Sequence, residues 1–229
     1  MKLRPYQEII RQHMLAVERC NVWSFMGSGK TISTLTLLDY LYRFGFESRP
    51  TIILAPLRVA RSVWPAEVKK WPHIDLEVSP IIGTEAERSA ALKRDVPIHT
   101  VNYENLPWLL TKLRGKWTYG AVVADESTKL KGHRLNSGGL RAGVLAKVAH
   151  ETPRWINLTG TPSPNGLIDL WGQQWFIDGG ARLGKTFTSF KERWFYPHPS
   201  GYGVKAHEFA QEQIQARLSD CTLSVKAKD

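Results

Sequence analysis

The segment VWSFMGSGKT, Val22–Thr31, decides the fold of this chain. Its beginning, Val22–Phe25, is largely apolar and predicts a buried strand, and a helix is expected to begin at Lys30. Gly27 and Gly29 lie between them, and without a Cβ they let backbone N–H groups point at a bound phosphate. The helix N-terminus adds its own unpaired N–H groups and the positive end of its dipole. The order of strand, glycine turn and helix therefore predicts a phosphate-binding loop.

Each residue of this loop has an expected role. Lys30 supplies a cation for the β- and γ-phosphates of a nucleoside triphosphate, and Thr31 supplies a hydroxyl ligand for Mg²⁺. We expect the following residues to surround the phosphates: Met26, Gly27, Ser28, Gly29, Lys30 and Thr31. Ser24 stands where the full pattern has its first glycine. A chance Gly-Ser-Gly turn is the alternative, but the apolar strand before it and the amphipathic helix after it favour a phosphate loop.

Apolar runs and helical periodicity alternate along most of the chain. Short apolar runs predict buried strands at Thr51–Pro56, Val78–Ile82, Ile98–Val101, Ala121–Ala124 and Trp155–Leu158. Helical spacing of apolar residues predicts helices at 32–41, 59–71, Glu85–Leu92, Glu104–Leu113, Leu140–Val148 and Leu167–Phe176. Strands that alternate with helices form a parallel sheet with right-handed crossovers. The fold class is therefore α/β, with a parallel central sheet and helices on both faces.

The two ends of the chain differ from this pattern. At the N-terminus, an apolar stripe predicts an amphipathic helix with Ile9, Ile10, Met14 and Val17 on one face. After about Gly180 the alternation stops, and aromatic and basic residues precede a helix near 208–218. We therefore predict a sheet domain over residues 1–180 and an aromatic, basic helical appendage over residues 181–229.

Gln7 lies at the start of the N-terminal helix. Its amide has a donor and an acceptor, which could both pair with an adenine edge. The alternative is a plain surface glutamine on a packing helix, and taken alone Gln7 favours that alternative.

An acidic pair, Asp125 and Glu126, follows the apolar run Ala121–Ala124. Open parallel sheets bind ligands at the carboxyl ends of their strands. A buried acidic pair is costly unless it holds a metal or performs chemistry. We expect Asp125 to orient Mg²⁺ through water, and Glu126 to act as the base that positions and deprotonates the attacking water. A solvated turn with a helix-capping aspartate is the alternative, but the phosphate loop upstream favours a catalytic pair.

The segment WINLTGTPSPNG places Thr159, Gly160 and Thr161 at the end of the next strand. Small hydroxyl residues and a glycine at that position could sense a γ-phosphate or link it to a bound polymer. By itself, the segment favours the simpler interpretation of a strand followed by a turn.

Composition and charge limit the partners. The chain has 229 residues, with 31 Lys and Arg against 21 Asp and Glu, for a net charge of +10 and a sequence pI near 9.7. This excess of positive charge suits a polyanionic partner, of which nucleic acid is favoured over an anionic membrane surface. A basic soluble protein without such a partner is the alternative. Cys20 and Cys221 show no metal-ligand or CxxC spacing. No apolar run approaches the ~20 residues of a membrane helix, so we expect a soluble intracellular protein that does not bind a membrane.

Taken together, the motifs resemble the ATP-binding lobe of the second helicase superfamily, and within it the Swi/Snf-type DNA-dependent ATPases. The similar segments are LRPYQ (Leu3–Gln7), MGSGKT (Met26–Thr31), ILAPLRVARSVWPAEVKKW (Ile53–Trp71), VNYENL (Val101–Leu106), DESTKLKG (Asp125–Gly132) and LTGTPSPNGLIDLW (Leu158–Trp171). The resemblance runs from about Leu3 to Trp194, and the order of the motifs makes it specific.

This resemblance implies a three-layer, RecA-like P-loop NTPase domain that uses ATP and Mg²⁺. It implies that Gln7 reads adenine. It also implies that non-sequence-specific, double-stranded DNA lies against Pro56, Arg58, Arg61, Asn102 and Tyr103. The residues implied to couple nucleotide state to the rest of the lobe are Thr128, Thr159, Gly160 and Thr161.

Two departures from the family matter. Ser127 and Thr128 replace the usual Ala-His after the acidic pair, and Thr128 can form hydrogen bonds but cannot carry charge. The second RecA-like lobe, which supplies arginine fingers in the family, is not found in this sequence. Arg4, Arg134 or Arg141 could substitute for such a finger, but their positions in the sequence do not indicate that any of them lies opposite Lys30.

We therefore expect the N-terminal lobe of a DNA-dependent, ATP-hydrolysing translocase, weak by itself and needing a second lobe in the same chain or in a partner. The alternative is a nucleotide-gated binding module without appreciable hydrolysis. A small-molecule kinase fits poorly, because no acceptor site is evident. The resemblance suggests a phage or bacterial source, and hence the cytoplasm of a bacterial or phage-infected cell.

Overall fold

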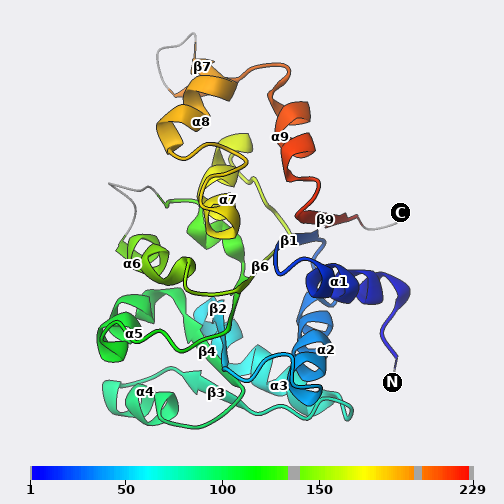
Figure 1. Ribbon diagram of the computed structural model, residues 1–229, viewed down its shortest axis with the longest axis vertical. Coiled ribbons are helices and arrows are strands. Elements are labelled where there is room, and N and C mark those ends of the chain that lie inside the picture. The colour runs from blue at the N-terminus through cyan, green and yellow to red at the C-terminus, as the bar shows by residue number, and fades with distance from the viewer. Residues whose placement is uncertain (1, 134–139, 199–202, 227–229) are drawn as a thin grey trace.

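A parallel sheet forms the centre of the computed structural model, which describes residues 2–133, 140–198 and 203–226 (Figure 1). Within these residues the sheet has seven strands in the order β3-β4-β2-β5-β6-β1-β9. Every pairing in it is parallel. The strands are β1 (Arg19–Ser24), β2 (Thr51–Ala55), β3 (Val78–Ile81), β4 (Ile98–Asn102), β5 (Ala121–Asp125), β6 (Arg154–Thr159) and β9 (Thr222–Val225). The predicted α/β fold with a parallel central sheet is confirmed.

The sheet separates two hydrophobic cores. Along β2, Ile52 and Leu54 belong to one core, whereas Ile53 and Ala55 belong to the other. All four side chains are fully buried. A strand covered on both faces is apolar at most positions, which is why β2 could be recognised as a nearly continuous apolar run.

Helices cover both faces (Figure 1). One face carries α1 (Pro5–Ala16), α2 (Lys30–Arg43) and α3 (Trp64–Lys70), and the other carries α4 (Glu85–Leu92), α5 (Leu106–Leu113), α6 (Leu140–Ala149) and α7 (Leu170–Asp178). The start of α4 is set by a capping box, in which the Thr84 hydroxyl accepts from Glu87 N and Thr84 N donates to the Glu87 carboxylate. Among the described residues, no helix combines the length and the apolar character that crossing a membrane would require.

Two local predictions were wrong in detail. The helix expected over 59–71 begins as one π-turn, Val59–Val63, before α3. Pro65 lies in the first turn of α3, where it has no N–H to offer and its ring hinders an α-helical turn before it. On α1, Ile10 and Met14 are fully buried, but Ile9 is 51% exposed and does not share their face.

The C-terminal segment returns to the sheet. It contains α8 (Phe187–Trp194), the antiparallel pair β7 (Phe195–Pro197) and β8 (Val204–Ala206), α9 (Ala210–Leu218) and then β9. Strand β9 pairs in parallel with β1, and Asn21 N donates to Cys221 O at 2.8 Å. The division at residue 180 stays a prediction, but the sheet itself extends beyond that residue, which the sequence analysis did not predict.

Candidate nucleotide-binding site

The strand order brings the predicted motifs to one edge of the sheet. Strands β5, β6 and β1 are neighbours, so the segments that follow them meet at their carboxyl ends. Trp23 pairs with Thr159, and Asp125 pairs with Leu158. A Cβ built on Gly160 would lie 3.6 Å from Ser24 O, so the segment after β6 packs against the loop after β1.

The loop after β1 has the backbone of a phosphate cradle. Gly27 and Gly29 adopt φ angles of +79° and +83°, which L side chains rarely adopt. Ser28 N donates to Phe25 O at 3.2 Å and closes the turn. Helix α2 then begins at Lys30, as predicted.

Lys30 folds back onto the loop. Its Nζ donates to Ser24 O at 2.7 Å and to Phe25 O at 3.1 Å. Burial lowers the pKa of Lys30, while the charges of Asp125 and Glu126 act in the opposite direction. A triphosphate would offer the ammonium group charged oxygens in place of neutral carbonyls, a stronger interaction.

Other atoms around the loop fit a bound Mg-nucleotide. Ser28 Oγ is buried and has no partner among the described residues. Thr31 is half-buried in the first turn of α2, beside the loop. A buried hydroxyl without a partner is unusual in a folded protein, and a ligand oxygen is one way to satisfy it.

Asp125 is held at the end of β5 by two donors. Trp64 Nε1 donates to Oδ2 at 3.0 Å, and Glu126 N donates to Oδ1 at 3.1 Å. Burial raises the pKa of Asp125 to about 6, although the bond from Trp64 and the charge of Lys30 oppose this increase. A divalent cation would favour the ionised carboxylate. Asp125 therefore suits a metal-orienting role.

Glu126 has a strained backbone. Its φ of +56° and ψ of 54° lie in the left-handed region, where a residue with a side chain is uncommon. The residue precedes a 3₁₀ turn, Ser127–Leu130. Strain of this kind often occurs at functional sites, where surrounding contacts maintain it.

Gln7 is not a surface residue, so the interpretation favoured by its position alone was wrong. It is 8% exposed, and its Nε2 donates to Ser28 O at 3.3 Å. Its Oε1 accepts from Arg4 N at 2.9 Å. A Cβ on Gly29 would lie 2.2 Å from Gln7 Nε2, so the glutamine rests directly on the phosphate loop. Its contact with adenine stays a prediction.

The residues predicted to contact nucleic acid divide into two groups. Arg58 and Arg61 are exposed after β2, and Pro56 is half-buried beside them. Asn102 and Tyr103 are only 5% and 2% exposed, so their side chains are not presented to a ligand in this structure. Tyr103 instead donates its hydroxyl hydrogen to the backbone oxygen of Asp125 at 2.8 Å.

The predicted coupling residues are also placed. Thr159 Oγ1 accepts from Thr161 N at 3.1 Å, which shapes the turn after β6. Within the described part of the chain, the hydroxyl of Thr128 forms no hydrogen bond that we identify. Of the arginines considered as substitutes for a finger, Arg134 lies outside the described residues, and only the backbone of Arg141 is described.

The sequence analysis gave no role to three residues that lie beside this site: Trp64, Ser127 and Gln173. Trp64 belongs to an apolar stripe, which does not reveal what its indole N–H contacts. Gln173 carried a usable signal, because it and Gln174 interrupt the apolar run of α7 with amides. Amides buried in a helix normally have specific partners.

Comparison with known proteins gives a consistent family. A profile of the SNF2-related domain matches residues 24–221. Protein p41 of Acyrthosiphon pisum secondary endosymbiont phage 1 is 52% identical over 233 residues, covering 99% of this chain and 51% of that protein. The transcription regulatory protein SNF2 of Saccharomyces cerevisiae is 30% identical over 200 residues. The match covers 82% of this chain and 11% of the yeast protein.

A solved structure has the same fold. The SWI2/SNF2 ATPase core of Sulfolobus solfataricus in complex with dsDNA superposes with a TM-score of 0.72 at 24% identity, covering 98% of this chain and 44% of that one. The chain spans about half the length or less of each of these relatives.

Proposed function

This chain belongs to the SNF2-related domain family of helicase-like ATPases, and from that premise we propose that it is the ATP-binding lobe of a DNA-dependent translocase. The convergence of Lys30, Asp125 and Glu126 at one sheet edge carries the proposal. In the proposed complex, Met26–Thr31 surrounds the phosphates and Gln7 faces the adenine. Thr31 would ligate Mg²⁺ through its hydroxyl and Asp125 would orient the ion through water, and Mg²⁺ when bound would neutralise charge on the phosphates.

The chain's own residues would divide the work of hydrolysis. Lys30 would leave Ser24 O and Phe25 O and bind the β- and γ-phosphates. Glu126 would orient a water molecule for in-line attack on the γ-phosphate and accept its proton. Trp64 and the backbone N–H of Glu126 would hold the Asp125 carboxylate in place while this occurs.

Nucleotide binding is tested by Lys30→Ala. Among the described residues, Lys30 Nζ donates to the carbonyl oxygens of Ser24 and Phe25. Removal of the side chain empties no hydrophobic core, so we expect a folded protein with strongly weakened ATP binding. Lys69→Ala is the matched control, since Lys69 is exposed on α3, outside the loop. Isothermal titration with Mg-ATP measures both. Unchanged affinity in a folded Lys30→Ala protein would remove the loop from the proposal.

Double-stranded DNA, bound through its backbone, is the proposed partner. Support comes from the net charge of +10 and from Arg58 and Arg61, which are exposed after β2. Binding should weaken steeply with salt, and each arginine removed should reduce the salt slope by about 1. Fluorescence anisotropy with duplexes of unrelated sequence measures both. A salt-independent affinity or strong sequence discrimination would indicate another partner.

We also propose that efficient turnover needs a second RecA-like lobe. An arginine supplied across a cleft accelerates phosphoryl transfer by ~10³–10⁵. Among the described residues, no hydrogen bond or ion pair joins an arginine side chain to residues 25–31. Phosphate release by this chain should be slow and barely stimulated by DNA, and it should recover when a second lobe is supplied. In the presence of the second lobe, Glu126→Gln should bind ATP without hydrolysing it.

The alternative function, a nucleotide-gated binding module, predicts that phosphate release does not recover when a second lobe is supplied. Rapid DNA-stimulated release by the chain alone would contradict the need for a second lobe.

A further inference from the structure

The start of α7 touches two segments that the proposed site must coordinate. One is the turn after the acidic pair, and the other is the loop after β6. Ser127 Oγ donates to Gln173 Oε1 at 2.9 Å, and Gln173 Nε2 donates to Pro162 O at 2.7 Å and to Asp169 O at 3.0 Å. Ser127 is fully buried and Gln173 is 3% exposed. The amide of Gln173 therefore bridges the two segments, with both of its polar atoms paired.

A second bridge lies one turn earlier. Asp169 Oδ2 accepts from Lys131 Nζ at 3.3 Å and from Asn165 N at 2.9 Å. Lys131 belongs to the segment after the acidic pair, and Asn165 belongs to the loop after β6. The same two segments are thus joined twice to the same end of α7.

Close packing fixes the distance between α7 and the turn. A Cβ on Gly172 would lie 2.5 Å from Lys131 O and 2.8 Å from Leu130 O, both of them backbone atoms. Only glycine permits this approach. With the backbones in contact, the bond from Ser127 to Gln173 cannot lengthen without moving the whole turn.

The bridge acts on Glu126 through its neighbour. Ser127 follows Glu126 directly, and the left-handed backbone of Glu126 persists only if the surrounding structure maintains it. The bond between Ser127 and Gln173 is one such restraint. A displacement of Glu126 would shift Ser127, and through Gln173 it would shift the carbonyl of Pro162.

We propose that Gln173 is a positioning residue that couples the acidic pair to the 160–166 loop through Ser127 and Pro162. This inference rests on the proposed function, because the nucleotide supplies the displacement. It also accounts for the replacement of Ala-His by Ser127 and Thr128. The hydroxyl that joins the acidic pair to the loop after β6 is that of Ser127, one residue before the position where the family has its histidine.

The test compares two adjacent buried glutamines. Gln173→Leu removes the bridge. Gln174→Leu is the matched control, because Gln174 is also buried in α7 but bonds to Asn21 at 2.8 Å and to Asp178 at 2.7 Å, away from both segments. Ser127→Ala removes one bond with minimal change in volume and serves if Gln173→Leu does not fold. Each variant is studied as the full chain.

Amide hydrogen exchange of residues 160–166 is measured with and without a non-hydrolysable ATP analogue and Mg²⁺, alongside the affinity for the analogue. We expect the wild type and Gln174→Leu to show a nucleotide-dependent change in exchange over this loop. Gln173→Leu, Ser127→Ala and their double mutant should all lose that change, with affinity within about threefold of the wild type.

Three results would overturn the inference. Retention of the nucleotide-dependent change in Gln173→Leu and Ser127→Ala, with normal binding, would refute it and leave the proposed function standing. If Gln174→Leu also lost the nucleotide-dependent change in hydrogen exchange, the loss in Gln173→Leu would be a general effect of altered packing in α7. Failure of the wild-type chain to bind the analogue would refute the proposed function and, with it, this inference.

Discussion

At the scale of single residues, the site has features that cost stability. Asp125 is a carboxylate whose pKa is raised to about 6 by burial, and Glu126 adopts a left-handed backbone. Each feature is unfavourable in the free chain and suits the binding of phosphates and a cation, so these residues are expected to trade stability for function.

Asp125→Asn tests whether the buried carboxylate lowers the stability of the nucleotide-free chain. Because the folded pKa is raised above the unfolded value of about 3.9, ionised Asp125 destabilises the nucleotide-free chain above about pH 6, and the penalty disappears as pH falls from 6 towards 4. We expect Asp125→Asn to be more stable than the wild type by roughly 1–3 kcal/mol at pH 7. This difference should close towards pH 4.

Urea unfolding of the two proteins from pH 4 to 8 measures this difference. The same substitution should remove the Mg²⁺ dependence of ATP binding. A stability difference independent of pH would show that Asp125 does not titrate in this range.

Gly29→Ala and Gly27→Ala form a matched pair. Both introduce a side chain at a positive φ, which costs about 1–2 kcal/mol. A Cβ on Gly29 would also collide with Gln7 Nε2, whereas no atom of the described residues lies within 4 Å of a Cβ on Gly27. We therefore expect similar losses of stability but a larger loss of ATP affinity in Gly29→Ala, because Gln7 is displaced from the loop. Adding Gln7→Ala should narrow the difference in affinity. Equal affinities in the two glycine variants would contradict this contact.

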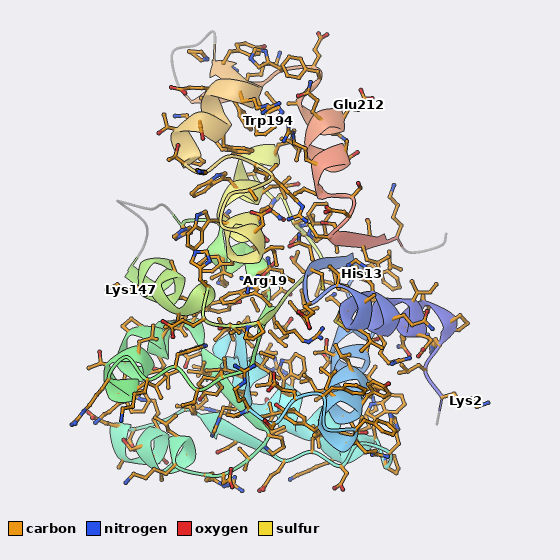
Figure 2. All side chains as sticks on the ribbon, viewed as in Figure 1. Lys2, His13, Arg19, Lys147, Trp194 and Glu212 are labelled. Atoms are coloured by element: carbon orange, nitrogen blue, oxygen red, sulfur yellow. The ribbon has the colours of Figure 1, made fainter. Side chains whose placement is uncertain are left out.

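At the scale of elements, local chemistry sets where helices begin and tertiary contacts set how they pack. The capping box of Thr84 and Glu87 sets the start of α4. The π-turn Val59–Val63 lies directly before α3, which has Pro65 in its first turn. Arg19, in the interior of the view in Figure 2, donates to backbone carbonyls at the ends of α6 and α7, including Ile177 O at 2.7 Å. A charged side chain thereby pairs with carbonyl groups in the last turns of both helices, where backbone oxygens lack an intrahelical donor.

Gly172→Ala tests the packing of α7. The added Cβ meets backbone oxygens that cannot move aside, so we expect a loss of about 1–3 kcal/mol in the free energy of unfolding. Gly143→Ala in α6 is the control, because no described atom lies within 4 Å of its Cβ. Alanine is favoured over glycine inside a helix, so that variant should gain about 0.5–1 kcal/mol. Thermal unfolding measures both, and a gain in Gly172→Ala would disprove the close approach.

At the scale of the whole molecule, the C-terminal segment is joined to the sheet domain by a strand and by a shared core. Strand β9 pairs with β1 at the edge of the sheet. Phe190, Trp194 and Leu218 belong to the same hydrophobic core as Trp171 and Phe176 of α7. Trp194 lies between α8 and α9 in Figure 2. Burial of this aromatic surface makes residues 181–229 a stabilising part of the lobe.

Truncation after Gly180 should therefore yield a protein that aggregates or unfolds without cooperativity, because it exposes the tryptophans of α7 and the edge of β1. Truncation after Cys221 keeps α8 and α9 but removes β9, and it should retain a cooperative transition with a lower midpoint. Circular dichroism during heating and limited proteolysis measure both. A stable, cooperative 1–180 fragment would support an independent domain that ends at residue 180.

Much of the fold and part of the site could be predicted from the sequence because the signals are local. Buried parallel strands are mostly apolar, so β2 to β6 were found within a residue or two. The glycines and Lys30 of the phosphate loop are adjacent in sequence, and so are Asp125 and Glu126. Their convergence at one edge follows from the general rule for parallel sheets.

The remaining features depend on contacts between distant parts of the chain, and only the tertiary structure decided them. Ser127 and Gln173 are 46 positions apart, and Trp64 and Asp125 are 61 positions apart. A tyrosine such as Tyr103 has the same local signature whether it faces DNA or donates to the oxygen of Asp125. The pairing of β9 with β1 joins opposite ends of the chain. Hydrogen bonds and burial of this kind are set by the packing of the whole molecule, which no local pattern of residue types determines.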